Sequence, residues 1–209
     1  MRPGGVVSLK RLNKFGFLQK NKLLFFMCIV FVVGIAIGSL SVTRGTRAAN
    51  FASYLFERYF TRRHELKFFG IFTAALAKNL LSSLIFFILG ASIIGVIASP
   101  IFCVILGMYF GGVASYVYSQ FALQGVAFNS VILVPSALAF CACSFFAAKE
   151  SFEFSTVLLK LTMPKSRPLN VSAEFKIFCG RVLIISLCYA AAALIDAAVS
   201  VLFIRYFGF

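Results

Sequence analysis

The stretch Leu23–Val42, LLFFMCIVFVVGIAIGSLSV, decides the fold class, because it contains no charged residue and is interrupted only by Ser39 and Ser41. At a rise of 1.5 Å per residue, roughly 20 residues form a helix of about 30 Å, which matches the hydrocarbon thickness of a bilayer. A cleaved signal peptide usually has a shorter apolar region of about 7–15 residues. We therefore expect an uncleaved first transmembrane helix behind a basic cytoplasmic tail, residues 1–22.

The composition of the whole chain supports the same class. Of 209 residues, 61% are hydrophobic and 12% are charged, whereas soluble domains are about 45–50% apolar and about 25% charged. The net charge of +14 fits basic residues that flank membrane spans and contact anionic lipid headgroups. The sequence thus predicts an all-α, polytopic integral membrane protein whose basic residues face membrane lipid and bind no nucleic acid.

Alternating apolar and polar segments predict the organisation of a single membrane domain, residues 23–209. Pro100 is expected to end the second span, and Pro135 to kink or open the fourth. The polar loops are residues 43–70 and 149–178. The five expected spans are about 23–42, 72–98, 101–118, 128–148 and 181–204.

The first polar loop contains a helical pattern of its own. Asn50 is a candidate N-cap, and aromatic residues such as Phe51, Tyr54 and Tyr59 recur after it at helical spacing. This pattern predicts a short amphipathic helix, which either lies on the membrane surface or packs as a connecting helix.

An odd number of spans places the two termini on opposite sides of the membrane. The dense basic tail favours a cytoplasmic N-terminus by the positive-inside rule, although the loop at 43–70 is also basic. We expect a multi-pass protein of the cell membrane with its N-terminus inside and its C-terminus outside.

Ionisable groups within the expected spans are few. Asp196 lies well inside the last span, and Lys78 lies near one end of the second. A two-aspartate protease needs a second acid that shares a proton, and the only His is His64, in a polar loop. No phosphate loop, zinc motif or haem motif is present. We expect no catalytic residues, no metal and no cofactor, and hence no enzyme.

Asp196 lies on a helical stripe of small and polar residues that includes Tyr189 and Ser200, so it is expected to face protein. We hypothesise that Lys78 or Asn79 holds it. Ion or proton translocation is the functional alternative.

Small residues in the spans indicate close helix packing or partner docking. Such positions pack helices within one chain more often than they join two chains. The candidates are Gly34 and Gly38 in the first span, Gly90 and Gly95 in the second, and Gly107 and Gly111 in the third.

The ordered set of elements resembles the stage II sporulation protein M (SpoIIM) family over nearly the whole chain. The similarity shows in the Gly34–Gly38 span, the LGxxxxG stretch from Leu89, the glycine-spaced third span and the Val134-Pro135 pair. It continues in the last-span pattern Ala193-Leu-Ile-Asp196-Ala, where the family usually has Glu instead of Asp.

This resemblance implies a role in engulfment, when the mother-cell membrane migrates around the forespore. It implies a scaffold at the septal and engulfing membrane for two membrane-anchored cell-wall enzymes, an amidase/endopeptidase and a lytic transglycosylase. Partner spans could dock on the Gly34/Gly38 face or the Asp196 stripe, and juxtamembrane segments on residues 43–70. The alternative is a permease-like subunit of a transport system, with an ATPase that contacts residues 149–178.

Overall fold

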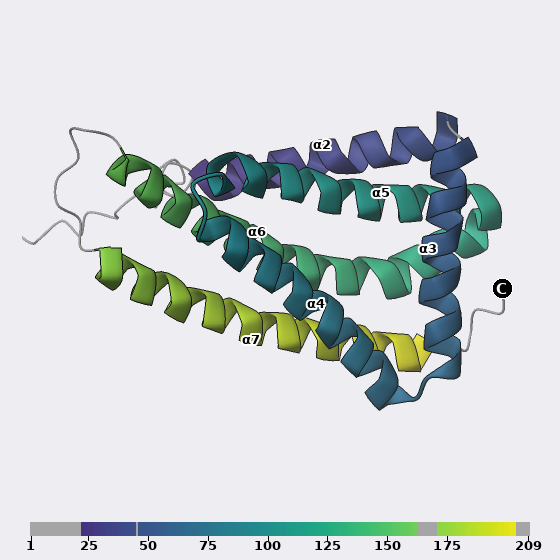
Figure 1. The fold of residues 1–209 in the computed structure, drawn as a ribbon. Coiled ribbons are helices and arrows are strands. Elements are labelled where there is room, and N and C mark those ends of the chain that lie inside the picture. Colours follow the sequence, from purple (N-terminus) through teal and green to yellow (C-terminus); the bar gives the residue numbers. More distant parts are fainter. Residues whose placement is uncertain (1–21, 45, 163–170, 204–209) are drawn as a thin grey trace, which may run out of the picture.

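The computed structural model describes residues 22–44, 46–162 and 171–203, and these are almost entirely helical (Figure 1). The predicted all-α class is confirmed. The elements are α2 (Lys22–Arg44), α3 (Thr46–Glu65), α4 (Phe68–Gly90), α5 (Gly95–Phe128), the π-helix η1 (Asn129–Leu133), α6 (Val134–Leu161) and α7 (Val171–Phe203).

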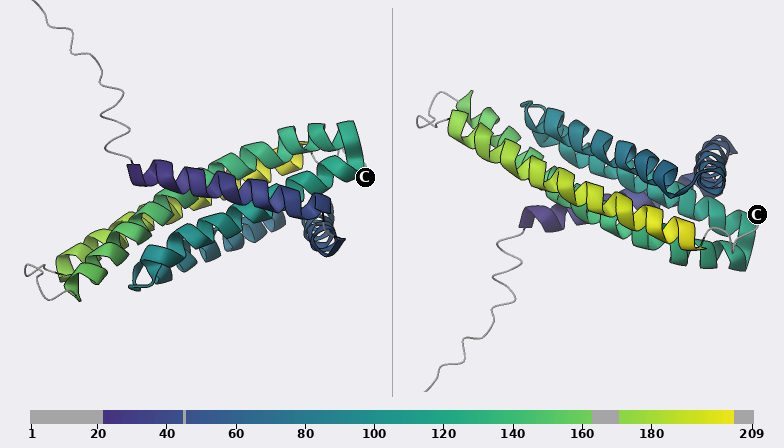
Figure 2. Two further views of the ribbon diagram at one scale, coloured as in Figure 1. Left: turned by 90° about the horizontal axis from the view of Figure 1, so that it is seen from above. Right: turned by 90° about the horizontal axis from the view of Figure 1, so that it is seen from below.

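The long apolar helices run side by side in one bundle, and α3 lies across one end of it (Figures 1 and 2). This end also holds the reversal between α5 and α6 and the C-terminal end of α7. The opposite end holds the start of α2, the α4–α5 turn and the tips of α6 and α7. The two polar regions of the sequence therefore lie at opposite ends of the bundle.

Among the residues that the structure describes, four helical segments are long and apolar enough to cross a membrane, and the third of them runs for 67 residues, Gly95–Leu161. A straight helix of that length would measure about 100 Å, more than three times the hydrocarbon thickness. Instead the chain reverses at Ala122, where φ is 44°, so that its two arms run antiparallel (Figure 1). This segment contains both the third and the fourth expected spans, and the count of five crossings stays a prediction.

The position of Pro100 corrects one expected boundary. Pro100 lies inside α5, and the chain turns earlier, where the Ser92 amide donates to the Leu89 carbonyl at 3.1 Å. Helix α5 continues through Pro100, although this proline has no N–H to donate to the Val96 carbonyl four residues before it. Pro135, in contrast, follows the π-helix η1 directly, which agrees with the expectation that it opens the fourth span.

The second polar segment is helix and not the expected loop over most of its length. Helix α6 continues to Leu161, and α7 already begins at Val171. The two extensions are joined by an Arg181–Glu150 ion pair of 2.8 Å and by the stacked rings of Phe154 and Phe178, whose centroids are 4.6 Å apart. Pairing between the two arms therefore stabilises helices that polarity alone does not predict.

Helix α3 is longer than expected, because it begins at Thr46 and not after an N-cap at Asn50. Its Ala52 and Phe56 are buried, and Phe56 packs on Phe128 with ring centroids 5.7 Å apart. Its Phe51 and Tyr54 remain 64% and 56% exposed. The sequence left open whether this helix packs on the bundle or lies on the membrane surface. In the structure one face of α3 packs on the bundle, and aromatic residues elsewhere on the helix stay exposed.

Candidate functional site

A buried ion pair joins α3 to the membrane bundle. The Arg63 guanidinium donates to Asp196 of α7 through both of its terminal nitrogens, with an Nη1–Oδ1 distance of 2.9 Å. The same Nη1 donates to the Ser200 hydroxyl, one helical turn beyond Asp196. Both charged side chains are less than a tenth exposed. Bidentate pairing of this kind fixes orientation as well as distance, so it locks the end of α3 onto α7.

Tyr59 completes the α3 side of this pair. Its ring lies 3.8 Å from the Arg63 guanidinium carbon, a cation–π contact. Burial raises the pKa of the Tyr59 phenol above its ordinary value, so the hydroxyl keeps its proton. The residues Ala52, Phe56, Tyr59 and Arg63 recur at spacings of four, three and four along α3, which places them on the face toward the bundle.

The hypothesis that Lys78 or Asn79 holds Asp196 is wrong. Asn79 is 3% exposed, and its side-chain amide donates to the Tyr189 carbonyl of α7 at 3.0 Å. The Lys78 amine lies 5.2 Å from the centre of the Phe140 ring. Since Arg63 already supplies two donors to the carboxylate, Asp196 needs no further cation.

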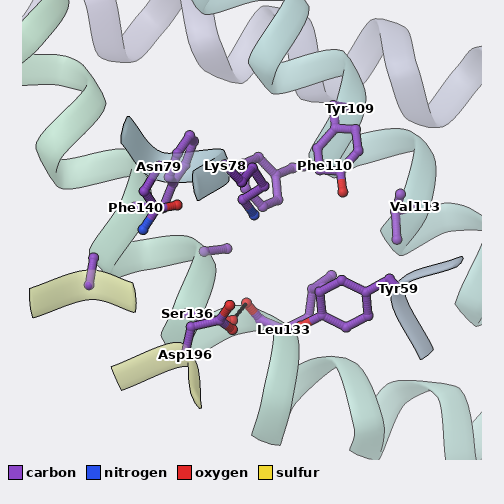
Figure 3. Close-up of a pocket in the computed structure, with 12 residues that line it drawn as sticks. Tyr59, Lys78, Asn79, Tyr109, Phe110, Val113, Leu133, Ser136, Phe140 and Asp196 are labelled. Atoms are coloured by element: carbon purple, nitrogen blue, oxygen red, sulfur yellow. Dashed lines mark hydrogen bonds between the residues drawn. The ribbon is translucent and has the colours of Figure 1, made fainter. Parts of the chain in front are cut away.

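Lys78 nevertheless points into the same polar cavity as Asp196 (Figure 3). The cavity has a volume of about 20 Å³, which is room for about one water molecule. Tyr59 and Tyr109 close it from α3 and α5, while Ser136 lies beside Asp196. Three positions singled out from sequence, Lys78, Asn79 and Asp196, therefore do meet in space, but around a different ion pair.

Sequence reasoning missed Arg63 for a physical reason. It lies in a basic segment, where each cation is expected to face headgroups and water. The available signal was the face that it shares with Phe56 and Tyr59, together with the need of a buried Asp196 for a partner. Pairing across 133 positions of sequence leaves no local pattern.

The glycine pairs of the first and third spans pack against each other within the chain. A Cβ on Gly34 would overlap the Val104 carbonyl oxygen, and one on Gly107 would overlap that of Phe31. Gly38 and Gly111 face Met108 and Ile35 in the same way. Helix backbones that approach so closely need glycine at the contact. Because α5 covers the Gly34/Gly38 face, the hypothesis that partner spans dock on this face is wrong.

Two further glycines hold the opposite end together. Gly90 at the end of α4 packs on the backbone of Ser151 and on the Phe178 ring. Gly95 at the start of α5 faces the Leu89 carbonyl and the Ser155 hydroxyl. The Ser155 hydroxyl also donates to the Gly90 carbonyl at 3.0 Å, so the α4–α5 turn is fastened to α6.

The Asp196 stripe is also internal, because Asp196, Tyr189 and Ser200 are all buried. It is therefore occupied by α3 and α4 and does not serve as an open docking face for a partner span. Within residues 22–44, 46–162 and 171–203, no group of three or more His, Cys, Asp or Glu side chains is arranged to hold a metal ion.

These features define a polytopic all-α membrane protein whose surface helix is tied to the bundle by one buried ion pair. Residues 27–201 match the family model described as stage II sporulation protein M. The chain therefore belongs to the SpoIIM family, and the resemblance seen in the sequence is confirmed. No curated protein and no solved structure matches the chain.

Proposed function

We propose that this SpoIIM-family protein is a membrane scaffold of the engulfment machinery. In this role it anchors and localises a membrane-anchored amidase/endopeptidase and a lytic transglycosylase while the mother-cell membrane migrates. Family membership supports a sporulation-related membrane protein. The scaffold role itself is inferred from the arrangement of the helices.

The observation that carries the proposal is the attachment of α3 across one end of the bundle. The Arg63–Asp196 pair holds this helix in a fixed orientation, which leaves Phe51 and Tyr54 more than half exposed. Of the three surfaces considered from sequence, the Gly34/Gly38 face and the Asp196 stripe are covered. The outward face of α3 remains open and suits a juxtamembrane segment of a partner.

A groove beside this face extends the candidate docking surface. It lies between α2, α3 and α5, has a volume of about 390 Å³, and is lined by small residues such as Gly38 and Ala52 and by Leu55 and Met108. An apolar groove bordered by exposed aromatics fits the anchor of a membrane-bound enzyme better than it fits a polar solute.

The test is deletion of the gene in its own host, followed by membrane-dye microscopy after sporulation is induced. We expect asymmetric septation followed by arrest at a flat or bulging septum, with rescue by the intact gene. A Phe51→Ala, Tyr54→Ala variant should rescue poorly and should recover less of the two enzymes in pull-downs. Phe25→Ala, which changes an aromatic that is 55% exposed on α2, is the matched control. Normal engulfment in the deletion strain would refute the proposal.

The permease-like alternative is not favoured by the family match. The polar cavity at Asp196 has room for about one water molecule, which is smaller than a transported solute requires. The α6–α7 extensions, which an ATPase would have to contact, pair with each other through Arg181 and Glu150.

A further inference from the structure

A second feature of α3 is a basic groove on the side that faces α4. The groove has a volume of about 100 Å³ and is lined by three cations, Arg58, Arg63 and Lys78. Its apolar lining includes Leu66, Ile71 and Ala75. Among the residues whose side chains the structure describes, no acidic residue contributes to its lining.

The charges in this groove are not balanced by the residues that the structure describes. Arg63 is neutralised by Asp196. Arg58 and Lys78 form no ion pair with a described carboxylate, and the hydrogen bond of Arg58 runs to the neutral Tyr54 hydroxyl at 3.5 Å. Since the Arg63–Asp196 pair is neutral, Arg58 and Lys78 leave a net positive charge in the groove. An anion would be attracted to this charge, and the attraction is stronger where bulk water is excluded.

The position of the groove selects the kind of anion. It lies between the surface helix α3 and the N-terminal half of the spanning helix α4, which we place at the side of the membrane where headgroups meet hydrocarbon. Lys78 lies on the side of α4 that faces α3, and side chains on a helix tilt toward its N-terminus. Its amine lies over the Phe140 ring, and Lys78 lines both this groove and the polar cavity at Asp196, so the end of this long side chain is within reach of either.

We propose that this groove binds the phosphate of an anionic phospholipid. Arg58 and Lys78 contact the phosphate oxygens, Arg63 keeps its partner Asp196 and shapes the site, and the acyl chains lie along the exposed apolar face of α4. The part of that face nearer to Lys78 includes Leu81 and Ile88, each 58% exposed. A phosphate joined to apolar chains satisfies both the cations and this face, whereas free phosphate satisfies only the cations.

The experiment uses the full chain in detergent micelles and measures the binding of phosphatidylglycerol by native mass spectrometry. Phosphatidylcholine and inorganic phosphate are the comparison ligands. We expect the intact protein to retain phosphatidylglycerol. The Arg58→Gln, Lys78→Gln variant should bind it about 30-fold more weakly, given the usual contribution of two cations near a membrane surface.

Arg47→Gln is the matched control, since Arg47 is an exposed cation of the same helix that does not line the groove. Equal weakening by this variant would show a general charge effect and overturn the proposal. Equal retention of phosphatidylcholine would do the same, and saturation by inorganic phosphate that displaces the lipid would identify a phosphate site instead. A folded Arg58→Gln single variant, verified by its thermal unfolding, keeps the test valid if the double variant does not fold. This measurement is independent of engulfment, so it can fail or succeed whatever the fate of the scaffold proposal.

Discussion

Arg63, near the end of α3, and Asp196, about two turns before the end of α7, form an almost fully buried ion pair in which two guanidinium nitrogens donate to the two carboxylate oxygens. It joins a helix outside the membrane spans to one within them. Because the pair also engages Ser200 and Tyr59, it fixes how the outward face of α3 is presented. Both the proposed docking of partners and the proposed lipid site depend on that orientation.

Removing one member of this pair should destabilise the protein strongly. Arg63→Ala leaves an uncompensated carboxylate, and Asp196→Ala leaves an uncompensated guanidinium, so each should cost about 3–5 kcal/mol. The double variant should cost less than the sum of the two. The free energy of unfolding in detergent, measured in a double-mutant cycle, gives the coupling directly.

The same cycle with Lys78→Met and Asp196→Ala is the control. Since Lys78 contacts the Phe140 ring and not the carboxylate, its coupling to Asp196 should be the smaller of the two. A coupling for Lys78 equal to that of Arg63 would contradict the observed pairing.

Gly107, at the crossing of α2 and α5, should not tolerate a side chain, whereas the nearby Gly112 should tolerate one. Gly107→Ala forces a methyl group into the Phe31 carbonyl, and overpacking of this kind costs about 1–3 kcal/mol. At Gly112 the nearest atom to a new Cβ is 3.7 Å away, an ordinary contact. Thermal unfolding of the two variants checks this, and similar losses for both would show that the crossing is looser than described.

The sequence predicts the bundle well, because each span is set by local hydropathy and length. It also singles out Gly34, Gly107 and Asp196, since small residues and charges inside apolar segments stand out from their surroundings. What these residues contact depends on the arrangement of the helices, and hydropathy does not contain that information. The close contact of Gly34 with Val104 and of Asp196 with Arg63 therefore had to come from the structure.

The errors at segment ends have a similar origin. The polar residues within 149–161 suggest a loop, yet this segment forms helix because Phe154 packs on Phe178 of the neighbouring arm, with the Glu150–Arg181 ion pair beside it. Pro100 suggests a helix end, yet the turn lies before Gly95, where the α4–α5 backbone packs tightly. In both places tertiary contacts outweigh local preference.

A hydrogen bond between α6 and α7 should contribute modestly to stability. The Tyr189 and Ser144 hydroxyls are 2.8 Å apart, and both residues are buried. In a double-mutant cycle of Tyr189→Phe and Ser144→Ala, the coupling should be about 0.6 kcal/mol, the average for such bonds within membranes. Tyr118→Phe, at a tyrosine that is 44% exposed, should change stability less. If the two hydroxyls show no coupling, the bond does not form in the folded protein.

The orientation in the membrane can be tested at the two ends of the bundle. Leu123, which is 85% exposed beside the reversal, lies at the α3 end, and Ile94, which is 71% exposed, lies in the opposite turn. We expect the α3 end to face outward, because the basic N-terminal tail should stay inside. In a background without the six native cysteines, Leu123→Cys and Arg47→Cys should react with an impermeant maleimide in intact cells. Ile94→Cys should react only after permeabilisation. Labelling of Leu123→Cys and Arg47→Cys from opposite sides of the membrane would contradict the fold. Labelling of Ile94→Cys alone in intact cells would show the reverse orientation, in which α3 lies in the cytoplasm, away from cell-wall enzymes.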